Sequence, residues 1–292
     1  MISNVQYHNN TDFDCFKAQL SEKDFDDFSK FIYSEYGIKM PPIKRVMLQG
    51  RLLKRIRELK MKSFSEYKDY FFSNEGQQKE LLQFLNVVTT NKTDFFREPI
   101  HFAFMNEVIL PDEHKKKQGS SFKVWSAGCS SGEEPYTISI VLNEFQLHNP
   151  AFKFEITATD ISTQMLEKAA KGIYPAAKID EVPLEIKKKY FLKSKDSANQ
   201  TIKVNQILQR NMTLSYVNLM ENYSFPNTFD LIFCRNVLIY FDRETQEKVI
   251  QKICTFLKPD GYIFIGHSES ISGMTLPLTH IKPTIFKKII IK

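Results

Sequence analysis

The chain has 292 residues, of which 42% are apolar and 25% are charged, and its net charge is +6. These values are typical of a folded globular protein of one or two domains, and they exclude an intrinsically disordered chain. No stretch reaches the roughly 18 consecutive apolar residues of a membrane span, the N-terminus has no signal-peptide pattern, and the cysteines lack metal-binding or disulfide spacing, so we expect a soluble cytoplasmic protein.

The first 90 residues show helical patterns only. Residues 1–20 are rich in Asn, Asp and Gln and are predicted to form a flexible leader. A helix is predicted to begin at Ser21, which forms a weak capping box with Asp24, and to end at Gly37. Residues 21–90 are therefore predicted to form an all-helical domain. Apolar spacing predicts its further helices over about 43–62, 65–72 and 77–88.

Beyond residue 90, short apolar strands alternate with helical segments, which indicates a mostly parallel sheet with helices on both faces. Residues 172–210 are too long for a simple crossover, so we predict a small β-subdomain inserted in a domain over 91–292. The predicted strands are 122–126, 154–159, 212–217, 229–234, 262–266 and 284–291. The predicted helices include 134–147, 162–171 and 243–257.

The turn after the first strand is suited to approaching a ligand closely. Gly128 and Gly132 lie just before a predicted helix, whose N-terminus favours a carboxylate or phosphate. The spacing is neither that of a dinucleotide-binding motif nor that of a P-loop, and Glu133 and Glu134 would repel a phosphate. These acids suit an ammonium group or a ribose better. The alternative is an ordinary strand-to-helix turn.

Polar residues also end two other strands. Asp160 ends the second strand, where a carboxylate can accept both hydroxyl hydrogens of a ribose; the alternative is an N-cap for the helix near Ser162. Together with the glycine turn, Asp160 favours an adenosine-containing ligand. Asn236 follows the fourth strand, next to Arg235. A buried asparagine needs several partners, so Asn236 either contacts a ligand or binds nearby backbone.

One segment before the sheet, Thr90-Asn-Lys-Thr-Asp-Phe-Phe-Arg-Glu98, resembles the signature of the CheR family of chemotaxis receptor methyltransferases. The resemblance covers about residues 21–290. It implies an α/β fold, with a Rossmann-like S-adenosylmethionine-dependent methyltransferase sheet, a small β insertion and an all-helical N-terminal domain. Further similar segments follow in the same order: 124–127, 131–136, 158–160, 233–237, 239–241, 257–261 and 266–269.

The resemblance also implies an activity and residue roles. The activity is methyl transfer from S-adenosylmethionine to glutamate side chains of methyl-accepting chemotaxis receptors. Arg97 and Tyr240 are implied to position the accepting glutamate, and Glu134 is an alternative to Glu133 for facing the cofactor. The implied cofactor contacts are Asn91, Thr93, Arg97, Glu133, Asp160, Asn218, Leu219, Asn236 and Val237.

No metal and no strong general base are expected. A glutamate carboxylate, with a reference pKa of about 4.3, is already ionised at neutral pH. Catalysis is expected to rest on alignment of the reacting atoms and on desolvation in the cleft.

Residues 41–62 hold eight basic residues and one acid. Lys44, Arg51, Arg55 and Lys62 fall on one stripe of the predicted helix. This excess predicts a surface that docks an acidic receptor helix, as the resemblance also implies, in place of a merely solvated face. The segment lacks interleaved aromatic residues that stack on bases, which disfavours nucleic acid. A monomer that is not inserted in the membrane is expected.

Two other functions remain open. The first is a methyltransferase with another acceptor; nucleic-acid amine methylases often carry an Asn/Asp-Pro-Pro-Tyr motif after the fourth strand, and Asn236 is not followed by prolines. The second is a catalytically inactive module that binds receptors or effectors. Loss of cofactor binding would favour the inactive module.

Overall fold

A computed structural model describes residues 19–116, 119–196 and 199–289. These residues divide into two compact units, with the boundary between Thr90 and Asn91. The predicted leader lies outside the described residues, except for residues 19 and 20. No described helix is long and apolar enough to cross a membrane.

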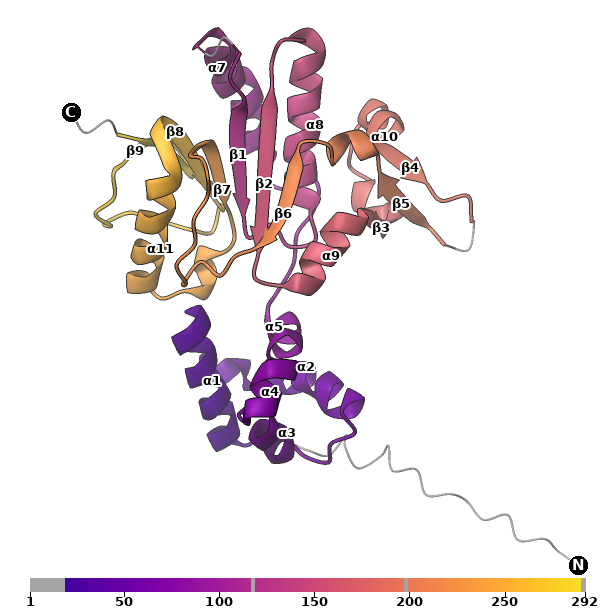
Figure 1. The fold of residues 1–292 in the computed structure, drawn as a ribbon, viewed down its shortest axis with the longest axis vertical. Helices are drawn as coiled ribbons and strands as arrows, with labels where there is room; N and C mark the ends of the chain where they lie inside the picture. Colours follow the sequence, from indigo (N-terminus) through magenta and orange to yellow (C-terminus); the bar gives the residue numbers. More distant parts are fainter. Residues whose placement is uncertain (1–18, 117–118, 197–198, 290–292) are drawn as a thin grey trace, which may run out of the picture. The chain divides into compact units, whose positions relative to one another are not determined.

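The first unit is helical throughout its described residues (Figure 1). Its elements are α1 (Glu22–Tyr36), the 3-10 turn η3 (Pro42–Lys44), α2 (Arg45–Glu58), α3 (Phe64–Phe71), α4 (Asn74–Lys79) and α5 (Leu81–Val88). Aromatic rings fill the core between these helices, and the ring centroids of Phe71 and Phe84 are 4.3 Å apart.

Helix α1 begins and ends where the sequence predicts. The Ser21 hydroxyl accepts a hydrogen bond from the backbone N–H of Asp24 at 3.0 Å, which satisfies one of the free donors of the first turn. At the other end Gly37 is left-handed, with φ 66°, and its N–H donates to the carbonyl of Tyr33. Phe28 and Ile32 point into the core.

The prediction that residues 77–88 are helical is confirmed, but the chain divides there into α4 and α5 with a break at Glu80. Glu80 is only 2% exposed. Its carboxylate accepts two hydrogen bonds from the Arg55 guanidinium, both at 2.7 Å, and one from the Tyr67 hydroxyl at 3.0 Å. A buried carboxylate requires such partners, and here they come from α2 and α3.

The predicted basic stripe is not a single helix face. Helix α2 ends at Glu58, so Lys62 lies beyond it, and Lys44 lies in η3. Arg51 donates to the carbonyls of Val88 and Thr89 and to the hydroxyl of Thr90, and Arg55 is held by Glu80. Two of the four residues predicted for docking, Arg51 and Arg55, therefore form hydrogen bonds within the first unit.

The second unit contains a seven-stranded sheet in the order β6-β2-β1-β7-β8-β10-β9. The strands β6, β2, β1, β7 and β8 pair in parallel, and β10 pairs antiparallel with both of its neighbours, β8 and β9. The strands are β1 (Phe122–Ala127), β2 (Phe154–Asp160), β6 (Met212–Tyr216), β7 (Phe229–Cys234), β8 (Leu257–Ile265), β9 (Leu278–Lys282) and β10 (Ile285–Lys288). The six predicted strands are confirmed with shifted ends, whereas β9 was not predicted.

Helices cover this sheet as parallel crossovers require. They are α6 (Pro99–Phe104), a π-helical turn η4 (Met105–Ile109), α7 (Leu110–Lys116), α8 (Glu133–His148), α9 (Thr163–Lys171) and α11 (Arg243–Phe256). The rings of Phe102 and Phe104 pack on the sheet, where Phe102 stacks on Phe233. This packing fixes the start of α6, and with it the segment just before it.

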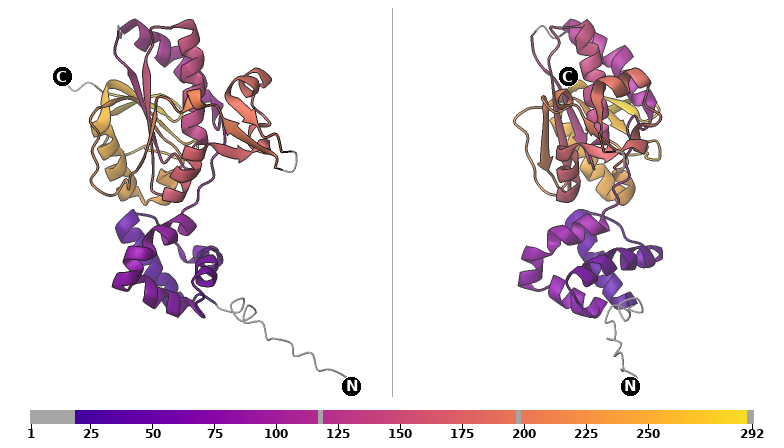
Figure 2. Two further views of the ribbon diagram at one scale, coloured as in Figure 1. Left: turned by 45° about the vertical axis from the view of Figure 1, so that its right-hand side comes forward. Right: turned by 90° about the vertical axis from the view of Figure 1, so that its right-hand side faces the viewer.

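The insertion after α9 is a small subdomain that packs against α8 (Figure 2). Its three strands pair antiparallel in the order β3-β5-β4. The ring of Phe95, from the segment before α6, packs edge-on against Tyr174 and Phe191, with centroids 5.2 Å from each. The elements of the insertion are β3 (Ile173–Pro175), η5 (Ala176–Ile179), α10 (Leu184–Tyr190), β4 (Phe191–Lys193), β5 (Thr201–Val204) and η6 (Gln206–Leu208).

The Glu80 cluster gives a stability prediction for the first unit. In Glu80→Ala, the Arg55 guanidinium loses its buried partner, and we expect the unfolding free energy of this unit to fall by about 3–5 kcal/mol. Glu75→Ala is the matched control, because Glu75 pairs with Lys79 at the surface at 2.8 Å. Thermal unfolding by circular dichroism measures both variants, and equal midpoints would contradict the prediction.

Candidate active site

The candidate site lies where four neighbouring parallel strands end. The strands β6, β2, β1 and β7 are adjacent in that order, so the segments after them emerge at one edge of the sheet. In open parallel sheets this edge is where ligands bind. The segments are 217–219, 160–162, 128–132 and 235–241.

The glycine turn after β1 permits two loops to approach each other. Gly128 and Gly132 have φ of 84° and 100°, in the left-handed region. A methyl group added at Gly128 would lie 2.4 Å from Cγ2 of Val237. Because no side chain fits in that space, glycine is required for the turn after β1 to lie against the loop after β7.

Asp160 holds the glycine turn from the end of β2. It is 7% exposed. Its carboxylate accepts hydrogen bonds from the backbone N–H groups of Ser130 and Ser162, both at 2.8 Å. Burial raises the pKa of the Asp160 carboxyl, and these backbone donors oppose that shift. The N-cap of α9 is Ser162, whose hydroxyl accepts from Met165 N–H at 3.2 Å, so the interpretation of Asp160 as that N-cap is wrong.

Glu133 and Glu134 have different surroundings at the start of α8. Glu134 accepts hydrogen bonds from the Ser126 hydroxyl at 2.7 Å and from Nε of Arg235 at 2.8 Å. Glu133 is 1% exposed and accepts from the Ser131 hydroxyl at 2.6 Å. Burial raises the pKa of the Glu133 carboxyl. Because Glu134 is committed to Arg235, Glu133 remains the better candidate for facing a ligand.

The segment 91–98 is fastened to the glycine turn and to α8. The carbonyl of Asn91 accepts from the Ser130 hydroxyl at 3.1 Å, and the N–H of Phe96 donates to the Thr137 hydroxyl at 3.1 Å. Arg97 is half-buried, and its guanidinium donates to the carbonyl of Lys92 at 3.0 Å. These hydrogen bonds fix the backbone position of Arg97, from which its side chain extends.

Lys178, from η5 of the insertion, bridges the same segment to α8. Its ammonium donates to the carbonyl of Thr93 and, at 2.7 Å, to the Asp94 carboxylate. It also pairs with Glu133 at 3.4 Å. Lys178 carries no local sequence signal of this role, because its three partners lie far from it along the chain.

Asn218 and Leu219 follow β6 and are both buried. The N–H of Val217 donates to the carbonyl of Asp160 at 3.2 Å, so Asn218 directly follows a residue that contacts the end of β2. The Asn218 side chain accepts from Met220 N–H at 3.0 Å and donates to Glu221 at 2.9 Å. These bonds shape the turn after β6.

Asn236, Val237 and Tyr240 lie in the loop after β7. Asn236 is left-handed, with φ 59°, and Tyr240 ends the short turn η7 (Leu238–Tyr240), half-buried. The N–H of Asn236 donates to the Glu269 carboxylate at 2.9 Å, and its side-chain amide lies 3.5 Å from Glu98. Glu98 and Glu269 are contacts that sequence reasoning missed, although Glu269 lies in a Gly-His-Ser-Glu segment that follows a strand.

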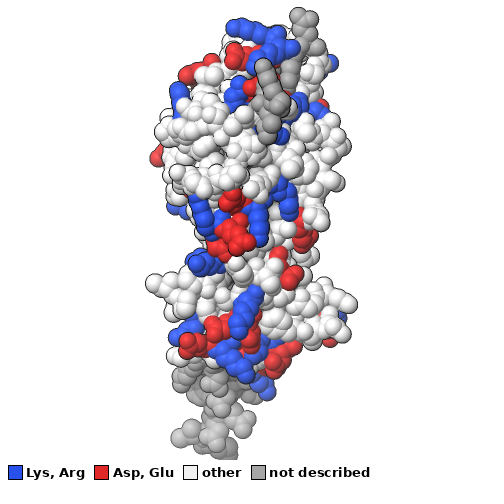
Figure 3. Space-filling view, turned by 90° about the vertical axis from the view of Figure 1, so that its left-hand side faces the viewer, with Lys and Arg blue, Asp and Glu red and all other residues white. Residues whose placement is uncertain are grey.

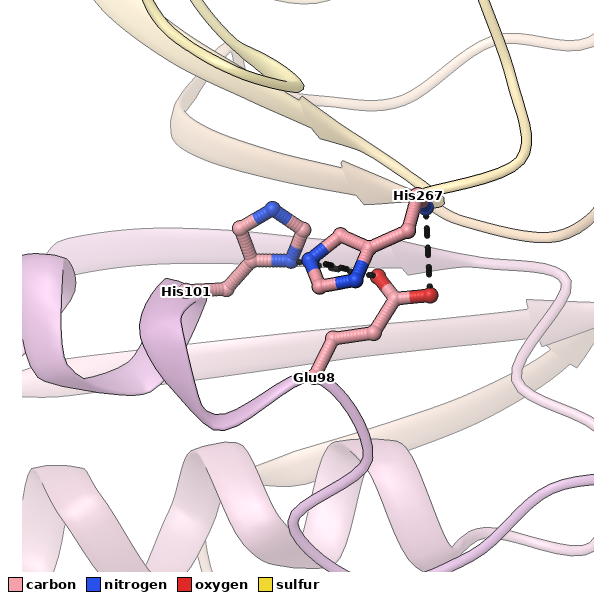
Figure 4. Close-up of side chains that lie close together, drawn as sticks. All are labelled: Glu98, His101 and His267. Carbon is pink, nitrogen blue, oxygen red and sulfur yellow. Dashed lines mark hydrogen bonds and ion pairs between the residues drawn. The ribbon is translucent and has the colours of Figure 1, made fainter.

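Glu98, His101 and His267 bring three potential metal ligands together (Figure 4). A cation already lies among them. A guanidinium nitrogen of Arg235 is 3.0 Å from Nδ1 of His101 and 3.6 Å from the Glu98 carboxylate. The Thr284 hydroxyl donates to the Pro283 carbonyl, so Nε2 of His101 donates to Thr284 and its Nδ1 accepts from Arg235. Arg235 therefore supplies the positive charge that a metal ion would bring.

Two family models match nearly the whole described chain. The CheR methyltransferase SAM binding domain matches residues 91–286, and the CheR methyltransferase all-alpha domain matches residues 23–89. The chain belongs to the CheR methyltransferase family. It is thus an S-adenosylmethionine-dependent methyltransferase, as the sequence resemblance predicted.

Curated relatives extend over most of the methyltransferase. A chemotaxis protein methyltransferase from Borreliella burgdorferi is 40% identical over 264 residues, which are 89% of this chain and 92% of the relative. The Salmonella typhimurium protein of the same name is 38% identical and covers 88% and 87% of the two chains. The Escherichia coli protein is 35% identical and covers 92% of each.

The residues at the strand ends fit S-adenosylmethionine. A buried carboxylate at Asp160 has lone pairs left beyond its two backbone donors, as ribose hydroxyls require. Gly128 presents bare backbone, and the second buried carboxylate, Glu133, suits an ammonium group. When bound, the cofactor supplies a methyl group on a positively charged sulfur.

The Asp160 contacts predict a binding defect. Asp160→Ala removes a charged acceptor, which is worth roughly 1.5–3 kcal/mol, so affinity for S-adenosylhomocysteine should fall about ten- to a hundredfold. Calorimetric titration measures this affinity. Asp230→Asn is the control, because Asp230 is a buried carboxylate that accepts from Lys123 N–H at 2.8 Å and lies near the start of β7. Affinity of Asp160→Ala within threefold of the unmutated protein would contradict the assignment.

His101 predicts a pH dependence of stability. Burial, and then the charges of Arg235 and His267, lower its pKa from 6.5 to about 3. Between these values the unfolded chain binds a proton that the folded chain does not, so stability is complete above pH 6.5 and falls as the pH drops. The loss should reach about 1.4 kcal/mol at pH 5.5.

Urea unfolding at pH 7.5 and pH 5.5 tests this, with fluorescence of Trp125 as the probe, because Trp125 is the single tryptophan and is fully buried in β1. In His101→Gln the change between the two pH values should shrink by that amount. An equal change in both proteins would show that His101 does not carry the effect.

Proposed function

We propose that this methyltransferase transfers methyl groups from S-adenosylmethionine to glutamate side chains in the cytoplasmic domains of methyl-accepting chemotaxis receptors. The observation that carries the proposal is the match to relatives named chemotaxis protein methyltransferase over 87–92% of their own lengths. We further propose that it acts in the cytoplasm as a monomer, and that no metal takes part.

The carboxylates around the loop after β7 support an acceptor that is already ionised. Glu134 is paired with Arg235, and Glu269 accepts backbone hydrogen bonds from Asn236 and Leu238. His101, the buried imidazole there, has its lone pair directed at Arg235. Among these groups none is placed to remove a proton from a hydroxyl or an amine. A glutamate carboxylate needs no such base, because its reference pKa is about 4.3.

The proposed step is an in-line displacement. An oxygen of the accepting glutamate forms a bond to the methyl carbon while the carbon–sulfur bond breaks, and the electron pair of that bond stays on sulfur. The products are a glutamyl methyl ester and S-adenosylhomocysteine. Arg97 would orient the acceptor carboxylate through charge-assisted hydrogen bonds, and the Tyr240 hydroxyl would donate a further hydrogen bond to the same carboxylate. Asn91, Thr93, Asn218, Leu219, Asn236 and Val237 would line the cofactor.

Docking is proposed for the basic surface of the first unit, with a revised set of residues. Arg51 and Arg55 have partners within the unit. Lys62 is exposed. We therefore propose that Lys44 and Lys62 are the members of the predicted set that meet the acidic receptor helix.

The observations favour neither of the other functions. A nucleic-acid acceptor calls for a broad positive surface, whereas Figure 3 shows Asp and Glu interspersed with Lys and Arg on the face that it draws. A catalytically inactive module is not favoured either, because both family models that match the chain are those of CheR methyltransferases.

Receptor methylation is the direct test. Membranes that contain chemotaxis receptors, incubated with the protein and radiolabelled S-adenosylmethionine, should gain label that mild base releases as methanol, because esters hydrolyse and methylated amines do not. In Tyr240→Phe, kcat should fall about ten- to a hundredfold, as the loss of one hydrogen bond at the reacting centre predicts, with affinity for S-adenosylhomocysteine kept.

Arg97→Ala should lower kcat further, because it removes a charge. Tyr262→Phe is the control, since Tyr262 lies on β8 and packs on Phe104. Base-stable label would reject a glutamate acceptor, and unchanged kcat in Tyr240→Phe would reject the role of that hydroxyl.

A further inference from the structure

Glu269 gathers the backbone of two loops on one carboxylate. It follows β8 and is 8% exposed. One oxygen accepts from the N–H of Asn236 at 2.9 Å and from the N–H of Gly266. The other accepts from the N–H of Leu238 at 2.7 Å and from that of Ile239 at 3.3 Å. Four backbone donors therefore converge on a single side chain.

The loop after β7 has the shape of an anion-binding nest. Asn236 is left-handed, with φ 59°, and Val237 is right-handed, with φ −111°. This alternation turns successive N–H groups toward one point, as in sites that bind phosphate or carboxylate ligands. Here the anion is a side chain of the same chain, because Glu269 accepts from the N–H groups of Asn236 and Leu238 on either side of Val237.

Gly266 is the second requirement for this arrangement. A methyl group added there would lie 2.4 Å from the side-chain nitrogen of Asn236 and 2.9 Å from the Glu269 carboxylate. The φ of Gly266 is not in the left-handed region, so the demand is for space and not for backbone freedom. Only glycine lets the ends of β7 and β8 come this close.

A second carboxylate holds Asn236 from its side chain. One oxygen of Glu98 accepts from His267 N–H at 3.1 Å and lies 3.5 Å from the Asn236 amide nitrogen (Figure 4). Glu98 directly follows Arg97 in the chain. Asn236 is thus fixed through its backbone by Glu269 and through its amide by the neighbour of Arg97.

We propose that Glu269 is a positioning residue for methyl transfer, which sets the backbone of residues 236–240 and thereby the places of Asn236, Val237 and Tyr240. The inference rests on the proposed function for the roles of those three residues. Glu269 would act through these residues, since the donors to its carboxylate are backbone N–H groups of the two loops. The Glu269 carboxylate accepts hydrogen bonds from four backbone donors, so positioning depends on both its geometry and its deprotonated state.

The test compares Glu269→Gln with Asp230→Asn. Glutamine keeps the size but replaces one acceptor oxygen by an N–H₂ group that faces two N–H donors. The loop after β7 should shift, and a displacement of the order of 1 Å at the reacting groups is expected to lower kcat about a hundredfold, with the KM for receptor little changed. Affinity for S-adenosylhomocysteine should fall about tenfold, because Val237 and Asn236 move.

Asp230→Asn is the matched control, because it alters a buried carboxylate that accepts from backbone and pairs with Lys258 at 2.9 Å, away from the loop. It should lose thermal stability but keep kcat and affinity within about twofold, since its loop bonds are intact. Gly266→Ala keeps the Glu269 carboxylate in the sequence but crowds both it and Asn236, so it should reproduce the kcat loss of Glu269→Gln.

Unchanged kcat and affinity in folded Glu269→Gln would overturn the proposal. A loss of kcat in Asp230→Asn, in proportion to the thermal stability which that variant loses, would also overturn it, because kcat would then follow stability and not the position of the loop. The affinity for S-adenosylhomocysteine needs no acceptor, so it separates the two proposals. If the unmutated protein binds S-adenosylhomocysteine but methylates no receptor, the proposed acceptor fails, and a tenfold loss of affinity in Glu269→Gln still supports positioning.

Discussion

The carboxylate of Asp160 accepts hydrogen bonds from Ser130 and Ser162, and the loops of the site are arranged around this contact. Ser130 in turn donates to the carbonyl of Asn91, so the segment before α6 is joined to the end of β2 through one serine. The loop after β6 joins the same strand end through Val217. Three segments distant in sequence thus meet at Asp160. The glycine turn donates to its carboxylate, the segment before α6 is bonded to that turn through the Ser130 hydroxyl, and the loop after β6 donates to the Asp160 backbone carbonyl.

This use of buried carboxylates has an electrostatic cost that the fold offsets locally. Burial raises the pKa of Asp160, Glu133 and Glu269, and hydrogen bonds from backbone or side-chain donors oppose each shift. Backbone N–H groups at strand ends need acceptors, and carboxylates supply two oxygens each. The same donors that stabilise the charge therefore become fixed in place. Rigidity and ionisation at the cofactor end of the sheet have a common origin.

Local patterns in the sequence were sufficient for much of this structure. The cap at Ser21, the left-handed Gly37 and the alternation of strands with helices depend on neighbours within a few residues, and they were predicted. The ends of parallel strands also located Asp160 and Asn236 at one edge, because topology alone brings them together.

Long-range pairing was not accessible in this way. Arg55 meets Glu80 across 25 residues and Lys178 meets Asp94 across 84, so helical periodicity assigned Arg55 to a docking stripe and gave Lys178 no role. A basic residue on a helix has the same sequence pattern whether its side chain binds a receptor or pairs with a buried glutamate. The break at Glu80 has the same explanation, since its partners Arg55 and Tyr67 lie elsewhere in the first unit. Strand β9 is different, because it pairs with β10, the next strand along the chain, at the edge of the sheet, and its mostly exposed residues lack the apolar run of a buried strand.

Lys178 also bears on how the insertion relates to the rest of the domain. Its ammonium is the shared cation of Asp94 and Glu133, one from the segment before α6 and one from α8. The insertion and the glycine turn therefore form one electrostatic unit. A chimera that exchanged residues 172–210 for those of a relative without a lysine at this place would leave two carboxylates unneutralised beside the glycine turn. The subdomain is therefore not an interchangeable module, and its hydrophobic core is also shared with Phe95 and α8.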